Sequence, residues 1–256
     1  MKAYEIVQKA RDVYRLSTIE VINALCSSFI ELHGDRRMQD DKSMIGGIGL
    51  IDNLQPITII GIQKGYNTEE NIRRNFGSSG PAGYRKAERL MKQAEKFNRP
   101  VLTLINTPGA YAAAESEEKG ISEAIASMLV TMSELTVPTL AIILGEGGSG
   151  GAIALALADK VWMMENSIYS ILSPEGFATI LWKDASLAPE AAEMMKLTAE
   201  DLLELKVVDR IIPEDEMSNK EQASYLVKEI KTAFDELFGQ SVEERVTQRY
   251  ERFRKF

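Results

Sequence analysis

The stretch Gly145-Glu146-Gly147-Gly148-Ser149-Gly150-Gly151-Ala152 decides the fold, because it joins an apolar segment to a run of small residues. The apolar segment 139–144 is typical of a buried strand, and residues 152–158 alternate alanine with other apolar residues, which is typical of a closely packed helix. A glycine-rich turn between strand and helix indicates an α/β domain, and three ligand chemistries compete for it.

The first candidate chemistry is dinucleotide binding. Gly145, Gly147 and Gly150 satisfy the pattern GxGxxG, and Glu165 lies near the position of a ribose-binding acid. The predicted helix after the glycines is short, however, and the stretch lies past the middle of the chain instead of opening a domain. The pattern is therefore a weak indication of a nucleotide site.

The second candidate is a serine nucleophile, because Gly147, Ser149 and Gly151 fit the pattern GxSxG. A hydrolase triad of this type needs a histidine downstream of the serine, and the single histidine, His33, lies far upstream. We expect Ser149 to be a turn hydroxyl and His33 to be a helix-end group. A P-loop is excluded because no Gly-Lys-Ser/Thr follows the glycines.

The third candidate uses only the backbone. Adjacent glycines at the start of a helix can present free N–H groups to a developing oxyanion, helped by the positive end of the helix dipole. The absence of a Cβ lets a planar acyl or ureido group approach closely. The alternative is that the glycines only let helix and strand pack together, which the alanines that follow also favour. The stretch by itself leaves both interpretations open.

The segments before the glycine stretch predict helices first and then a hairpin. Apolar residues at helical spacing predict two helices over residues 3–32, divided at Ser17, whose capping box is completed by Glu20. Gly34 is a plausible end for the second helix. Two Ile-rich segments separated by the turn signal Asp52-Asn53 then predict an antiparallel hairpin; they are residues 44–51 and 56–62.

Helices and strands alternate through the rest of the chain, which predicts the α/β class. The expected helices are 83–97, 121–135, a small-residue helix after the glycines, shorter helices to about residue 205, and two terminal helices capped at Ser218 and Ser241. The expected strands are 101–105, 139–144, 161–164, 168–172 and 207–212. Periodicity does not choose between a doubly wound sheet and other layered α/β folds.

The composition limits the possible partners and compartment. The 256 residues are 45% hydrophobic, enough for a sizeable core, and the net charge of −8 argues against nucleic acid or an anionic membrane as the main partner. One cysteine, Cys26, and one histidine cannot form a disulfide or a zinc finger within the chain, so any structural zinc belongs to a partner. The first residues lack a signal-peptide core, and no apolar run is long enough to span a bilayer, so we expect a cytoplasmic protein.

Several further motifs occur in a fixed order over about residues 3–215. They are Gly34-Asp35-Arg36, Asp40-Asp41-Lys42, Ile45-Gly46-Gly47-Ile48, Gln63-Lys64-Gly65, Ile72-Arg73-Arg74-Asn75-Phe76-Gly77, Gly83-Tyr84-Arg85-Lys86-Ala87, Thr107-Pro108-Gly109-Ala110-Tyr111, Ser173-Pro174-Glu175-Gly176 and Ile180-Leu181-Trp182-Lys183. Together with the glycine stretch, this set resembles the α subunits of the acetyl-CoA carboxylase carboxyltransferase, in the crotonase-like superfamily.

The resemblance implies a crotonase-like spiral of ββα units with helical segments at both ends. The expected organisation is an N-terminal helical segment over 1–34, a carboxyltransferase domain over 35–215 and C-terminal helices over 216–256, effectively one domain. It also implies transfer of a carboxyl group from carboxybiotin, on a biotin carboxyl carrier protein, to acetyl-CoA. The product is malonyl-CoA for fatty acid biosynthesis.

The resemblance further implies a division of labour between subunits. The α chain faces biotin, whereas a separate β chain holds acetyl-CoA and carries a zinc ribbon, in an α2β2 assembly. ATP is used by the biotin carboxylase component. No metal or cofactor is expected on the α chain alone, which agrees with its shortage of cysteine and histidine.

The site residues implied by the resemblance are mostly backbone groups. The N–H groups of Gly150 and Gly151 would hold the ureido oxygen of biotin after it loses CO2, and biotin acts as its own base. The residues expected to contact substrate are Gly147, Gly148, Thr107, Pro108, Gly109, Ala110, Arg73 and Arg74. For the turn after the strand the alternative is a purely structural role, and for the two arginines it is a solvated helix face.

The turn departs from the family pattern Asp-Thr-Pro-Gly-Ala-Tyr-Pro-Gly, with Asn106 at its first position and Ala112-Ala113 at its last two. The charge and the backbone freedom of the loop therefore change. Two further hypotheses stay open: an α-like structural or regulatory subunit with reduced activity, and a crotonase-type acyl-CoA hydratase or isomerase. The hydratase needs side-chain acids and bases, for which Glu146 and Glu175 are the candidates.

Overall fold

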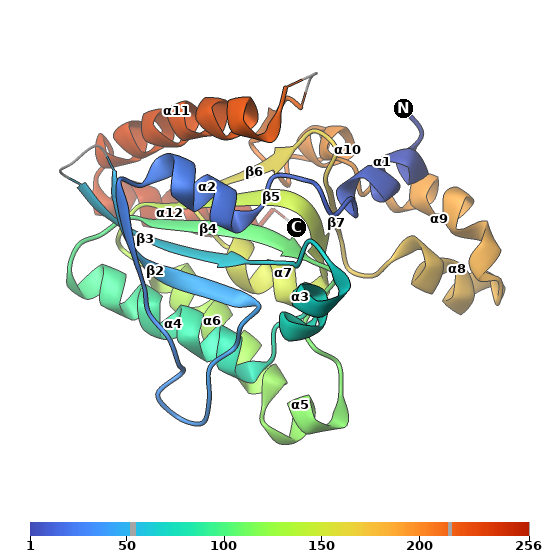
Figure 1. Cartoon of the computed structure of the whole chain (residues 1–256). Helices are drawn as coiled ribbons and strands as arrows, with labels where there is room; N and C mark the ends of the chain where they lie inside the picture. Colours follow the sequence, from blue (N-terminus) through green and yellow to red (C-terminus); the bar gives the residue numbers. More distant parts are fainter. Residues whose placement is uncertain (52–54, 215–216, 256) are drawn as a thin grey trace.

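The centre of the molecule is one mixed β-sheet (Figure 1). The computed structural model describes residues 1–51, 55–214 and 217–255. The strand order is β1-β2-β3-β4-β5-β6-β8, and β7 pairs with the carboxyl-terminal part of β5. The strands are β1 (Ser28–Glu31), β2 (Met44–Ile51), β3 (Gln55–Ile62), β4 (Val101–Thr107), β5 (Thr139–Gly148), β6 (Lys160–Met164), β7 (Ile168–Ser170) and β8 (Arg210–Ile212).

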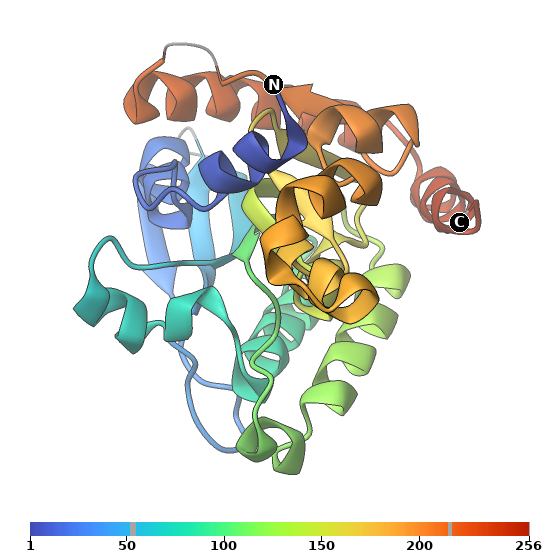
Figure 2. The same ribbon diagram turned by 90° about the vertical axis from the view of Figure 1, so that its right-hand side faces the viewer.

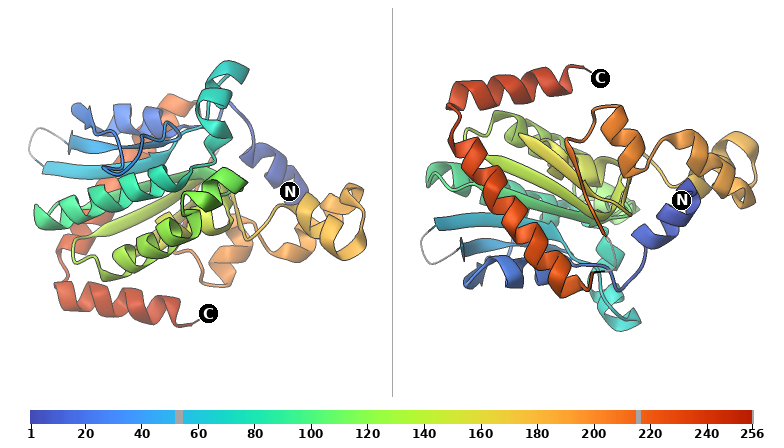
Figure 3. Two further views of the ribbon diagram at one scale, coloured as in Figure 1. Left: turned by 90° about the horizontal axis from the view of Figure 1, so that it is seen from below. Right: turned by 90° about the horizontal axis from the view of Figure 1, so that it is seen from above.

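Helices cover both faces of the sheet. In the described part of the chain, α2 and α11 lie over one face, and α4, α6 and α7 lie over the other (Figures 1 and 3). The α-helices are α1 (Ala3–Ala10), α2 (Thr18–Leu25), α3 (Thr68–Arg73), α4 (Pro81–Lys96), α5 (Ala114–Glu118), α6 (Ile121–Glu134), α7 (Ser149–Ala156), α8 (Pro174–Trp182), α9 (Ala188–Met195), α10 (Ala199–Glu204), α11 (Asn219–Phe238) and α12 (Val242–Phe253). The described residues also form two short 3-10 helices, η1 (Asn75–Gly77) and η2 (Ala185–Leu187).

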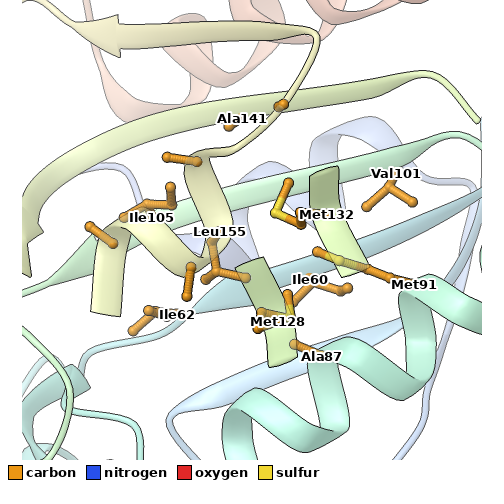
Figure 4. Close-up of a cluster of buried hydrophobic side chains, with 14 of the residues drawn as sticks. Ile60, Ile62, Ala87, Met91, Val101, Ile105, Met128, Met132, Ala141 and Leu155 are labelled. Atoms are coloured by element: carbon orange, nitrogen blue, oxygen red, sulfur yellow. The ribbon is translucent and has the colours of Figure 1, made fainter. Parts of the chain in front are cut away.

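The alternation of side chains along β4 shows why the sheet is buried on both sides. Leu102 and Leu104 join the cluster beneath α2 and α11, whereas Val101 and Ile105 join the cluster beneath α4 and α6 (Figure 4). Each fully buried Leu or Ile side chain contributes about 1.5–3 kcal/mol relative to exposure.

Strand direction changes within the sheet. The β1–β2 and β2–β3 pairs are antiparallel, and β3, β4, β5, β6 and β8 continue in parallel. The predicted hairpin is confirmed, with Met44 opposite Ile62. Its expected turn at Asp52-Asn53 lies outside the described residues. Because β4 and β5 run in parallel, the segments that follow them emerge at the same end of the sheet, where both strands have their carboxyl termini.

The predicted second helix, which was expected to continue to residue 32, is wrong in its last part. The helix ends at Leu25 because Cys26 is extended, and the N–H of Ser27 then donates to Leu50 O. Residues 28–31 form β1 at the edge of the sheet. Gly34 therefore lies in the loop after a strand, with φ 78°, and ends no helix. His33 is likewise no helix-end group: its Nδ1 lies 3.2 Å from Asp40 Oδ2.

The strand before the glycines is longer than predicted. It was expected to end at residue 144, but β5 continues to Gly148 because β7 pairs with its last residues. Helix α7 begins directly at Ser149. The glycine stretch is therefore half strand and half helix, with no loop between them.

The terminal helices agree with their capping signals. The capping boxes at Ser17, Ser218 and Ser241 are all present. Helix α11 runs across one face of the sheet (Figure 3, right). No helix among the described residues has the length and apolar character needed to cross a bilayer. The division at residues 34 and 215 stays a prediction.

Candidate active site

Two chain segments meet where β4 and β5 end. Thr107, the last residue of β4, is the register partner of Gly147 in β5. A Cβ placed on Gly148 would overlap the carbonyl of Pro108, and one placed on Gly151 would lie 2.6 Å from the amide nitrogen of Ala110. The structure thus brings together the turn and the glycine stretch, which the sequence separates by more than thirty residues. Figure 2 looks onto this end of the sheet, with α8 and α9 in front of it.

Unpaired backbone amides gather at this junction. Gly150 and Gly151 lie in the first turn of α7, where N–H groups have no acceptor within the helix, and no described side chain caps them. The amide of Ala110 also forms no hydrogen bond with the described residues, and sequence reasoning did not single it out as a donor. The positive end of the α7 dipole adds to this field. The arrangement can bind an oxyanion.

Close packing of helix against strand requires glycine at some positions of the stretch and not at others. Gly148 and Gly151 have no room for a Cβ, because backbone atoms of the neighbouring turn occupy the space. Gly150 is different: its Cβ would meet only the methyl groups of Ile125, at 3.8 Å, which is an ordinary van der Waals contact. Close packing therefore does not require glycine at position 150.

The turn after β4 is held by side-chain hydrogen bonds. Thr107 Oγ1 donates to Gly77 O at 2.7 Å and accepts from the N–H of Gly109 at 3.0 Å. Asn106 Oδ1 accepts from the N–H of Glu146 at 3.1 Å, so this residue ties the turn to β5 without adding a charge. The substitution of Asp by Asn in the family pattern keeps an acceptor at this position.

Sequence reasoning missed a strained segment beside the turn. Asn75, Phe76 and Gly77 have φ values of 47°, 52° and 78°, a left-handed conformation that Asn and Gly adopt readily and that is costly for Phe76. The bond from Thr107 to Gly77 O helps to hold it. Asn75 and Gly77 are residue types that favour this conformation, but three consecutive left-handed residues depend on tertiary contacts that the sequence does not show.

The serine in the glycine stretch has a strained backbone but no base. Ser149 has φ 51°, which resembles the sharp turn of a nucleophile elbow. Its hydroxyl forms no hydrogen bond with the described residues, and His33 instead lies beside Asp40 and Glu31. The geometry supports a turn hydroxyl at Ser149.

The two carboxylates required by the hydratase hypothesis are both engaged in ion pairs. Arg11 Nε lies 2.9 Å from Glu146 Oε1, and Lys64 binds the other oxygen of Glu146. Arg11 also binds both oxygens of Glu175, at 2.8 and 3.1 Å, and this pairing lowers the pKa of Glu175 to about 2. A carboxylate held this way is a poor general base near neutral pH.

The two arginines expected to contact substrate have different surroundings. Arg74 donates to Lys42 O at 2.9 Å and pairs with Glu70, so its guanidinium is largely occupied. Arg73 is exposed and lines a pocket of about 270 Å³ together with Tyr111. Neither side chain is placed at the glycine stretch by any contact in the described residues.

Comparison with protein families gives a match over the full chain. The family described as "Acetyl co-enzyme A carboxylase carboxyltransferase-like" matches residues 1–256. A protein of Streptococcus gordonii named "Acetyl-coenzyme A carboxylase carboxyl transferase subunit alpha" is 55% identical over 255 residues, which is 100% of this chain and 99% of that protein. The protein of the same name from Streptococcus pneumoniae strain Hungary19A-6 is 54% identical over 256 residues, the whole of both chains.

Solved structures with similar folds are more distant in sequence. The transcarboxylase 12S core superposes with a TM-score of 0.72 at 18% identity, covering 88% of this chain and 42% of the 12S chain. A Pseudomonas malonate decarboxylase hetero-tetramer in complex with coenzyme A gives 0.72 at 15% identity, covering 90% and 91%. These likenesses concern the fold alone. They confirm the predicted crotonase-like α/β class with helical segments at both ends.

Proposed function

Because the chain belongs to the family of acetyl-CoA carboxylase carboxyltransferase α subunits, we propose that it holds the biotin side of a shared carboxyl-transfer site. Membership makes it a transferase subunit of a biotin-dependent, multi-subunit carboxylase that serves malonyl-CoA and fatty acid biosynthesis. The proposal concerns which residues act, and which partners complete the site.

The observation that carries the proposal is the cluster of unpaired amides at Gly150, Gly151 and Ala110. Carboxybiotin supplies the carboxyl group, and its loss leaves negative charge on the ureido oxygen. The amides of Gly150 and Gly151 donate hydrogen bonds to that oxygen, with the dipole of α7 behind them. One preorganised donor of this kind is worth about 10²–10³ in rate.

The turn Thr107–Ala110 forms the opposite wall of the same site. Pro108 and Ala110 pack directly against Gly148 and Gly151, so the turn and the first turn of α7 would together present backbone to one side of a ureido ring. Gly147 lies beneath, paired with Thr107. We assign these residues to binding and orientation, and we assign Arg73 to contact with a phosphate or with the carrier protein at the rim.

The partners that complete the site are a β chain, the biotin carboxyl carrier protein and the biotin carboxylase. The β chain provides the acetyl-CoA site and carries the zinc ribbon, in an α2β2 assembly, while ATP is used by the biotin carboxylase. With one Cys and one His, this chain lacks the four Cys or His ligands of a zinc ribbon, so we assign the zinc to the β chain. We place the assembly in the cytoplasm, where an acidic chain with a single free cysteine is expected to work.

The proposal is tested by reconstitution. The purified chain, its β partner and the mixture are compared in malonyl-CoA-dependent carboxylation of biocytin, which is the reverse reaction. We expect turnover only in the mixture. Turnover by the α chain alone would contradict a shared site. An assembled but inactive mixture would instead favour the structural or regulatory α-like subunit.

A further inference from the structure

Tyr84 carries a buried hydroxyl without a partner. The residue lies in the first half of α4, its side chain is 0% exposed, and its ring belongs to the core cluster beneath α4 and α6. Its Oη has no hydrogen-bond partner among the described residues. Buried tyrosine hydroxyls nearly always find a partner, so this one requires an explanation.

The position of the hydroxyl is informative. A Cβ on Gly151 would lie 2.7 Å from Tyr84 Oη and 2.6 Å from the amide nitrogen of Ala110. The hydroxyl therefore lies close to Gly151, in the first turn of α7, and to Ala110, and the amides of both residues also lack partners among the described residues. Three unpaired donors thus lie in one small region of the molecule.

Packing alone does not account for the hydroxyl. Burying an unpaired polar atom is unfavourable. Phenylalanine would fill the same space in the core without that cost. Burial, and secondarily the carboxylate of Asp41, raise the pKa of Tyr84 above its usual range. The group therefore stays protonated, and can donate a hydrogen bond, at any pH at which the enzyme would work.

We propose that Tyr84 Oη is a third hydrogen-bond donor of the oxyanion site, and that it gains its partner when the ureido oxygen of biotin binds beside Gly151 and Ala110. This inference rests on the proposed function and extends it to a side chain. The oxygen reaches the hydroxyl through a small shift of the turn. Gly109, with φ 145°, is the residue where the turn has the backbone freedom to move.

The variant Tyr84→Phe tests the proposal, because it removes only the hydroxyl. In the reconstituted αβ enzyme we expect kcat for biocytin carboxylation to fall by about 10- to 100-fold, below the full effect of a backbone donor. The KM for malonyl-CoA should not change, since that substrate is held by the β chain. The unfolding temperature of the variant should equal or exceed that of the wild type, because an unpaired buried polar atom has been removed.

A matched control is Tyr225→Phe, which removes a hydroxyl from α11 on the other face of the sheet and should leave kcat unchanged. If Tyr84→Phe keeps kcat within about twofold of the wild type, the hydroxyl has no role at the oxyanion and the proposal is wrong. If kcat and unfolding temperature fall together, the hydroxyl is structural, which also overturns it. An inactive wild-type mixture would refute the proposed function instead, so the two failures are distinguishable.

Discussion

The first turn of α7 and the turn after β4 touch at Gly151 and Ala110: a Cβ at Gly151 would lie 2.6 Å from the Ala110 amide nitrogen. This contact places the amides of two separate segments in one site. The contact exists because β4 and β5 are parallel neighbours, so that both segments begin at the carboxyl ends of these strands. The proposed catalysis depends on this contact, since the one carboxylate in the glycine stretch, Glu146, is paired with Arg11 and Lys64.

The two glycines at the start of α7 should respond differently to a methyl group. Gly151→Ala puts a Cβ against the backbone of Ala110 and the hydroxyl of Tyr84, so we expect a stability loss of about 1–3 kcal/mol and loss of turnover. Gly150→Ala meets only Ile125 methyl groups and should keep the fold. Urea unfolding and biocytin carboxylation measure the two effects. Equal destabilisation by both variants would contradict the described geometry.

Replacing Ser149 with alanine should have little effect on turnover. The hydroxyl forms no hydrogen bond with the described residues and no base lies beside it, so we expect biocytin carboxylation within about threefold of the wild type. Ser149→Gly is the control for the strained backbone, because glycine adopts φ 51° without cost and should be the more stable variant. A loss of more than about 100-fold in Ser149→Ala, with normal unfolding, would reinstate a nucleophile.

Glu175 should contribute to stability in a pH-dependent way. Its pKa in the folded protein is about 2, chiefly because Arg11 hydrogen-bonds to it, against an ordinary value of 4.5. The folded pKa is lowered, so the stabilisation is complete above about pH 4.5 and is lost as the pH falls toward 2. The variant Glu175→Gln should therefore reduce the free energy of unfolding more at pH 7 than at pH 3.

The size of this pH effect is limited by solvent. The Glu175 side chain is 33% exposed, so screening should reduce the difference between the two pH values to about 1 kcal/mol. Glu204→Gln, at an exposed glutamate with no ion pair among the described residues, serves as the control and should show no such difference. An identical pH profile for Glu175→Gln and wild type would show that the ion pair does not stabilise the fold.

The role of residue 106 should be to accept a hydrogen bond, whether the side chain is the neutral Asn of this chain or the charged Asp of the family pattern. Asn106→Asp keeps an acceptor for the N–H of Glu146, so the free energy of unfolding should change by less than about 1 kcal/mol. Asn106→Leu leaves that buried N–H unpaired and should cost about 1–3 kcal/mol. Urea unfolding compares the two variants. A neutral Asn106→Leu would show that this bond does not hold the turn.

Much of the fold was predictable from local patterns. The capping boxes at Ser17, Ser218 and Ser241 act through neighbouring residues, and the predictions made from them are confirmed. The apolar spacing predicts a helix over the residues of β1, because Phe29 and Ile30 continue the spacing of α2. Their strand conformation comes from pairing with β2, a tertiary contact that periodicity does not report.

The site was predictable in its backbone and less so in its side chains. A glycine-rich turn after a buried strand indicates exposed amides, and the parallel strands then bring Thr107–Ala110 beside them. The ion pairs of Arg11 with Glu146 and Glu175 join three distant segments, so no local pattern revealed that these carboxylates are occupied. The unpaired hydroxyl of Tyr84 likewise depends on how α4 and α7 pack.

In the proposed mechanism main-chain amides neutralise the oxygen of biotin, and exchanging a single amide for an ester probes that step alone. Glycolic acid incorporated at position 151 converts the N–H into an ester oxygen while keeping the shape of the chain. The same exchange with lactic acid at Ala199, in the first turn of α10, is the control. We predict that the ester at position 151 lowers kcat by about 100-fold in the αβ assembly, with unfolding and β binding unchanged. Turnover equal to that of the Ala199 control would contradict the account.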